Sequence, residues 1–255
     1  MVFLSFVAST AVRAQAQADE PALIAICKAL GPSNRDVTAK SCAAFQKQFP
    51  ASPLMPVVRG LVGWCALQAG DRGEGVTKLF EAMVSDAGTP FSDATTTMAR
   101  RWLTRLDREK VKVALKKAYT EHVSYPATLD ALAKLPEGQK PPLNDRWGRP
   151  WRYHDAELKY VRGIKAQKYV LESSNMDRDQ DLKDALAKAY DVGTLLKPVK
   201  ILSREKGHES VSFAAGREPV VLAPGGRYRG VTLVYVGQNL VVLTDDDHWS
   251  VMPLP

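Results

Sequence analysis

Apolar residues recur at helical spacing through the first half of the chain. Between residues 20 and 105 they return every three or four positions, and each run ends where Pro or Gly breaks the pattern. A longer run begins near Asp107 and continues to about Ser124, because Pro126 disfavours helical backbone in the residue before it. Thr128 is then placed to cap a short second helix. The pattern predicts several short helices followed by one long helix.

From residue 195 onwards the pattern changes to that of strands. Short runs rich in β-branched residues alternate with turns that contain Gly. The runs are Val199–Leu202, Val211–Phe213, Pro219–Leu222, Val231–Val236 and Leu240–Leu243. The acidic turn Asp245–Asp247 is expected to be solvated. We predict an α+β chain with a helical region at 19–105, an α+β domain at 106–194 and a small antiparallel β domain at 195–255.

The residues of the middle region predict a tight turn that leads into a strand. Gly148 permits the positive φ that such a turn requires beside the bulky Trp147. Pro150 can begin a strand, where its missing N–H does no harm. Trp151 and Tyr153 then alternate onto one face of that strand. We expect this face to pack on the long helix.

The order of these motifs resembles the globular domain of the major pseudopilin of type II secretion systems. That family has a long helix, Tyr-Pro, a short helix, an Asp-Pro-Trp-Gly-Asn-Pro-Tyr turn, a strand, Tyr-x-Leu-x-Ser and an Asp/Gly-rich loop. The matching residues are Tyr125, Pro126, Asp145, Trp147, Gly148, Pro150, Trp151, Tyr153, Tyr169, Leu171, Ser173 and Asp177. The resemblance covers residues 106–181 and implies a helix packed on an antiparallel sheet, with structural roles for Tyr125 to Tyr153.

The resemblance also implies a calcium site, because the Asp/Gly-rich loop of that family binds calcium. The corresponding residues here are Ser173, Asp177, Asp179 and Asp181. Carboxylates at alternating positions can turn several oxygens towards one hard cation. Asn175 and Arg178 stand where the family has glycines. The same acidic residues can instead cap a following helix at Leu182–Tyr190, and the sequence leaves both interpretations open.

A second resemblance lies in the helical region. Residues 63–82 are similar to a tetratricopeptide helical hairpin, in which small residues stand where two helices cross. Gly63, Gly75 and Ala82 would serve at that crossing, and Gly70 begins the turn. Arg59 stands where the family has a large apolar residue. An irregular helical bundle explains the pattern equally well, and either arrangement implies packing or protein docking.

The first eighteen residues have the order of a secretory signal peptide. An apolar stretch, Val2–Val12, precedes two small-x-small sites that end at Ala16 and Ala18, although no basic residue precedes Val2. We expect export to the periplasm or cell envelope, with membrane contact only through an uncleaved signal. Residues 19–105 separate this signal from the pseudopilin-like domain, whereas pseudopilins have a long apolar helix there. An ordinary filament subunit is therefore not expected.

The three cysteines allow two interpretations. Cys27, Cys42 and Cys65 follow no zinc or CxxC spacing. In an oxidising compartment one pair can bridge two adjacent helices, which leaves one thiol over. All three can equally be small buried residues on helix faces.

Composition and charge exclude several classes of protein. The chain has 255 residues, of which 45% are hydrophobic and 25% are charged, so that wholesale disorder is excluded. The net charge of +7 is thinly spread, and its densest stretch, 108–117, includes Glu109 and lacks the interleaved aromatic residues of single-strand binders. We expect no nucleic-acid partner.

No catalytic motif stands out in the sequence. It contains no GxSxG, HExxH, P-loop or GxGxxG pattern, and we expect a protein that is not an enzyme. The expected function is that of an exported component or accessory of a type II secretion or type IV pilus-like apparatus, with protein partners. The alternatives are a helical-repeat periplasmic adaptor and a hydrolase whose site the sequence does not reveal.

Overall fold

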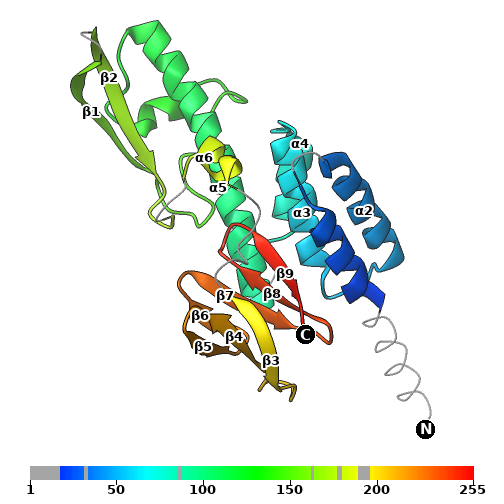
Figure 1. The fold of residues 1–255 in the computed structure, drawn as a ribbon. Coiled ribbons are helices and arrows are strands. Elements are labelled where there is room, and N and C mark those ends of the chain that lie inside the picture. The colour runs from blue at the N-terminus through cyan, green and yellow to red at the C-terminus, as the bar shows by residue number, and fades with distance from the viewer. Residues whose placement is uncertain (1–17, 32–33, 85–87, 162–163, 177–179, 189–195) are drawn as a thin grey trace, which may run out of the picture. The chain divides into compact units, whose positions relative to one another are not determined.

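The computed structural model describes residues 18–31, 34–84, 88–161, 164–176, 180–188 and 196–255 (Figure 1). The chain is α+β, as the sequence predicts, with helices first and antiparallel strands last. It divides into two compact units. The first comprises Met1–Ala99 and Ala189–Pro255, and the second comprises Arg100–Lys188. The helical and β regions that the sequence separates thus share one unit.

The helices of the first unit follow the Pro and Gly breaks. Residues 18–29 are helical, and α2 (Arg35–Gln48), α3 (Met55–Gln68) and α4 (Glu74–Glu81) come next. Helix α3 is the most buried of them, since it carries Val57, Val58, Leu61 and Leu67 at 0 to 1% exposure. No helix among the described residues is long and apolar enough to cross a membrane.

The predicted helix crossing depends on one glycine. A Cβ atom at Gly63 would lie 2.6 Å from Cζ of Phe80, so the close approach of α3 and α4 requires a glycine there. The prediction is wrong for the other two small residues. A Cβ atom at Gly75 would meet nothing within 4 Å, and Ala82 is exposed beyond the end of α4. Both lie away from the surface that α4 presents to α3.

The strands of the first unit form two antiparallel sheets. One sheet has the order β3 (Lys197–Ser203), β4 (Ser210–Ala215), β5 (Glu218–Leu222). The other has the order β6 (Arg227–Tyr228), β7 (Val231–Val236), β8 (Leu240–Thr244), β9 (Trp249–Pro253). One buried cluster joins the sheets, with members such as Phe213 from β4 and Leu233 from β7. The antiparallel β region is thus confirmed.

The turn between β8 and β9 is not solvated as predicted. Asp247 is 6% exposed and His248 is 2% exposed. Asp245 makes this burial possible, because its Oδ1 accepts hydrogen bonds from the backbone N–H groups of both residues, at 3.0 and 2.8 Å.

The N-terminal helix is tied to the strands through Glu20. This carboxylate is 1% exposed and accepts hydrogen bonds from the backbone N–H groups of Gln238 (2.9 Å) and Asn239 (2.7 Å), in the turn between β7 and β8. The absence of a side chain at Gly237 makes space for this contact, since a Cβ atom there would collide with the Glu20 carboxylate. Burial, Glu20 and Asp19 together raise the pKa of the nearby Tyr235 to about 12.

The long helix α5 spans Pro90–His122 and starts well before the predicted Asp107. Its beginning is a capped one: Thr89 Oγ1 accepts a hydrogen bond from the backbone N–H of Ser92, and Pro90 occupies the first helical position. The prediction missed that start. Its end is close to the predicted one, because Val123 adopts a φ of 58°.

The second unit packs a two-stranded hairpin on the C-terminal half of α5. Strands β1 (Arg152–Val161) and β2 (Ile164–Glu172) are antiparallel. The buried cluster joins Val111, Ala114 and Leu115 of α5 to Leu129, Leu132, Trp151 and Leu171. The predicted packing of the strand on the helix is therefore confirmed. The short second helix is a 3-10 helix, η2 (Leu129–Lys134), and α6 (Leu182–Ala187) is shorter than predicted.

Candidate functional site

Asp145 organises the predicted Trp-Gly turn of the second unit. It is 4% exposed, and its Oδ1 accepts hydrogen bonds from the backbone N–H groups of Trp147 (2.9 Å) and Arg149 (3.0 Å). Its Oδ2 accepts from Ser173 Oγ (2.6 Å) and Asn175 Nδ2 (2.8 Å). The carboxylate thus joins the turn before β1 to the loop after β2.

The charge of Asp145 is stabilised by these donors. Burial acts to raise its pKa, but the hydrogen bonds from Ser173, Asn175 and the two backbone amides outweigh burial and hold the pKa below the ordinary Asp value. Gly148 completes the turn with a φ of 80°, a value that favours glycine. The predicted residues Asp145 and Gly148 therefore have a structural role.

Three other predicted structural residues contact the rest of the unit through side-chain to backbone hydrogen bonds or a ring contact. Trp151 Nε1 donates to the carbonyl of Pro142 at 2.9 Å, and the Tyr153 hydroxyl donates to the carbonyl of Pro126 at 2.6 Å. The Tyr125 ring lies 4.7 Å from that of Tyr169, centre to centre. These contacts close the unit around α5.

Ser173, one of the predicted calcium ligands, is fully buried and already engaged. Its Oγ donates to Asp145 and accepts from the backbone N–H of Asn175 at 3.1 Å. Sequence reasoning missed Gln180, whose side-chain oxygen accepts from the Ser173 N–H at 2.8 Å. Its amide nitrogen donates to the carbonyls of Ser173 and Met176 and so closes the loop.

Asp181, a second predicted ligand, caps α6. Its Oδ1 accepts from the backbone N–H of Lys183 at 3.0 Å, and its Oδ2 pairs with Arg108 and Lys112, each at 3.1 Å. Burial opposes ionisation of Asp181, but Lys112, the Lys183 amide and Arg108 outweigh it and lower the pKa. The helix-cap interpretation of this residue is thus confirmed.

The remaining predicted ligands, Asp177 and Asp179, lie outside the described residues. Among the residues that the structure describes, no three His, Cys, Asp or Glu side chains come together as a possible metal site. The calcium site stays a prediction.

A buried ion pair of the second unit also escaped sequence reasoning. Asp107 is 2% exposed, and it pairs with the Arg146 guanidinium and with Lys110. The Arg146 backbone N–H also donates to Thr104 Oγ1 at 3.3 Å. No local signal links α5 to a residue so far along the chain.

The cysteines are free thiols in the structure, with Cys42 and Cys65 buried. Burial, with a smaller effect of Cys42, raises the pKa of Cys27 to about 12. Burial raises that of Cys42 to about 12 as well. A raised pKa disfavours the thiolate, which is the nucleophilic form of a cysteine.

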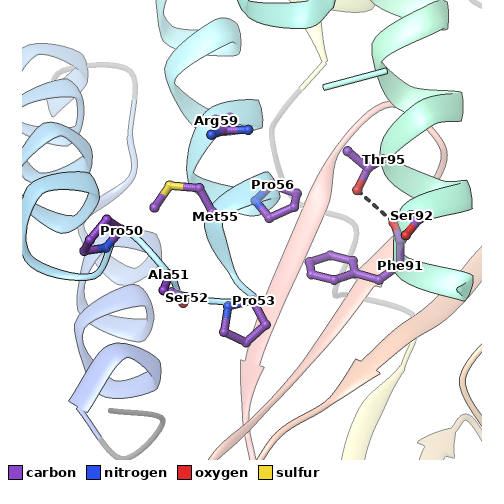
Figure 2. A pocket seen from close by; sticks show the side chains of 10 residues that line it. All are labelled: Pro50, Ala51, Ser52, Pro53, Met55, Pro56, Arg59, Phe91, Ser92 and Thr95. Carbon is purple, nitrogen blue, oxygen red and sulfur yellow. Dashed lines mark hydrogen bonds between the residues drawn. The ribbon is translucent and has the colours of Figure 1, made fainter. Parts of the chain in front are cut away.

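The first unit contains a pocket beside α3. It has a volume of about 440 Å³ and lies among the α2–α3 loop, α3 and the first turns of α5 (Figure 2). We call it the Arg59 pocket, after the cation in its wall. Its other walls combine the hydroxyl side chains of Ser52, Ser92 and Thr95 with apolar residues, among them three prolines, Met55 and Phe91.

Comparison of the chain with protein-family models, curated proteins and solved structures finds no match. The two family resemblances therefore rest on the sequence motifs alone and stay predictions. What the molecule itself defines is an α+β protein with a tightly bonded polar turn in one unit and an open pocket in the other.

Proposed function

We propose that the chain is a non-catalytic, exported component or accessory of a type II secretion or type IV pilus-like apparatus, which acts through protein contacts. The observation that supports this most is the packing of the motif residues Trp151 and Leu171 on Val111 and Leu115 of α5. The resemblance implies this arrangement of helix and hairpin.

The carboxylates of the second unit favour a structural role over catalysis. Each oxygen of Asp145 accepts two hydrogen bonds, and Asp181 is occupied by a helix cap and two cations. A general base needs a lone pair within reach of a substrate proton, and these oxygens have their donors already. They stabilise a surface on which partners can dock.

A contact surface on α5 is the place to test this proposal. Val113 is 69% exposed on the helix face away from the core cluster. A photo-crosslinking residue at position 113 should capture secretion or pilus subunits in cells that produce the protein. The matched control is position 221 on β5, where the valine is 56% exposed. Capture of no such subunit from position 113 would contradict the proposal.

The second candidate is a helical-repeat adaptor without a link to secretion. The Gly63–Phe80 crossing of α3 and α4 favours it, because such close helix pairs are the building unit of repeat proteins. Crosslinks from an exposed position on α2, such as the 57% exposed Val37, to other envelope proteins would support the adaptor instead.

A further inference from the structure

The Arg59 pocket places one cation in a wall of mixed polar and apolar side chains. Among the described residues, no carboxylate or carbonyl oxygen accepts a hydrogen bond from the Arg59 guanidinium. A guanidinium offers five N–H donors in a planar fork that matches a carboxylate. Its partly exposed position in this pocket leaves it accessible to an anionic group of a ligand.

Two of the three hydroxyl groups that line the pocket already donate to acceptors within the protein. Ser52 donates its proton to Asp19 Oδ2 at 2.6 Å, and Thr95 donates to the carbonyl of Phe91 at 2.7 Å. Ser92 Oγ lies 2.8 Å from Thr89 Oγ1. Among the polar side chains of the pocket, Arg59 is thus the one that can hold an anionic group.

The remaining walls suit an apolar body. Pro50, Pro53 and Pro56 lack N–H groups, so they cannot donate to the carbonyls of a bound peptide. Phe91 is held in place by Trp249, whose ring centre lies 5.5 Å away in an edge-on arrangement. A peptide would bury amide groups without partners here, at a cost for each. A ligand with a single polar group avoids that cost.

We propose that the Arg59 pocket binds a small organic monocarboxylate with an apolar body, whose carboxylate lies on Arg59. The volume of about 440 Å³ is within the range of small-molecule sites. The site is independent of the proposed secretion function, since all its residues belong to the first unit. A failure of the pocket to bind a carboxylate can therefore be distinguished from a failure of the proposed secretion function.

Calorimetric titration of the full chain tests the proposal with two acids, 3-phenylpropionate and hexanoate, and with the amide of each. At least one acid should bind saturably, and its amide should bind about tenfold more weakly or worse, because a charge-assisted hydrogen bond is lost. Arg59→Gln should weaken binding of the acid by a similar factor. Lys47→Gln, which removes an exposed cation on α2, should leave it unchanged.

Three results would overturn the proposal. They are equal binding of acid and amide, unchanged binding by Arg59→Gln, and no saturable binding of either acid at millimolar concentration. An acetylated tripeptide ending in Phe serves as a further probe, and binding of this peptide alone would assign the site to a protein chain end instead. If Arg59→Gln melts early, Arg59→Lys replaces it, since Lys keeps the charge but loses the fork, and the preference for acid over amide should then shrink.

Discussion

The Asp145→Asn substitution tests whether the charge of one carboxylate holds the second unit together. Asn has nearly the same shape as Asp but carries an NH₂ group in place of one oxygen. The best orientation keeps the oxygen on the N–H groups of Trp147 and Arg149. The NH₂ group then faces Ser173 Oγ and Asn175 Nδ2. Ser173 can turn to accept, but Asn175 cannot.

The expected loss follows from that geometry. One charge-assisted hydrogen bond disappears and one donor faces another, so the free energy of unfolding of this unit should fall by about 2 kcal/mol. Because 1.4 kcal/mol corresponds to a factor of ten, the amides of Trp147 and Arg149 should exchange with solvent roughly thirtyfold faster where they open with the turn. The melting temperature of a unit of this size should fall by about 10 °C.

Hydrogen exchange at pH 7 measures the effect, and urea unfolding at several pH values identifies its cause. The pKa of Asp145 is lowered in the folded state. Its stabilisation is therefore fully present above the ordinary Asp value and is lost as the pH falls through the lower folded value. The difference between wild type and Asp145→Asn should shrink there. The control Asp130→Asn, at an exposed position of η2, should match wild type throughout. Equal stability at pH 7, or a difference that persists in acid, would refute the role of the charge.

Three further substitutions and one addition, that of calcium, have definite expected outcomes. Gly63→Ala should destabilise the first unit by about 1–3 kcal/mol in urea unfolding through its collision with Phe80, whereas Gly75→Ala should be neutral or stabilise by up to about 1 kcal/mol. Glu20→Gln should lower the melting temperature and speed amide exchange at Asn239, and unchanged exchange there would contradict the anchoring role. Millimolar calcium should raise the melting temperature if the predicted site at Asp181 forms, and an unchanged melting curve would remove it.

The turns and packing faces of the second unit were predictable because their signals are local. Pro126 disfavours helical backbone in the residue before it, and Gly148 permits the positive φ of the turn. Trp151 and Tyr153 reveal their shared face by alternation alone. Helix spacing likewise predicted the long helix over residues 107–124, whose Val111 lies in the core. The start of α5 was missed although its signal is local too, since Thr89 and Pro90 together form a helix beginning.

The contacts that close each unit could not be predicted from one sequence. Glu20 meets Asn239, and Asp107 meets Arg146, over separations that no periodic pattern reports. The Arg59 pocket is a further example. The sequence shows Arg59 as a cation within an apolar helix. It does not show that the Phe91 ring, which comes from α5, lines the same pocket.

The polar loop that follows β2 already has protein partners at two of its four predicted calcium ligands. The resemblance assigned Ser173 and Asp181 to calcium, yet Arg108 and Lys112 of α5 already neutralise Asp181, and the Ser173 hydroxyl already donates to Asp145 of the Trp-Gly turn. A calcium ion bound through Asp181 would have to displace Arg108 and Lys112, whose ion pairs with it stabilise the attachment of α6 to α5. The positive charge that such a motif attracts is thus supplied at Asp181 by Arg108 and Lys112.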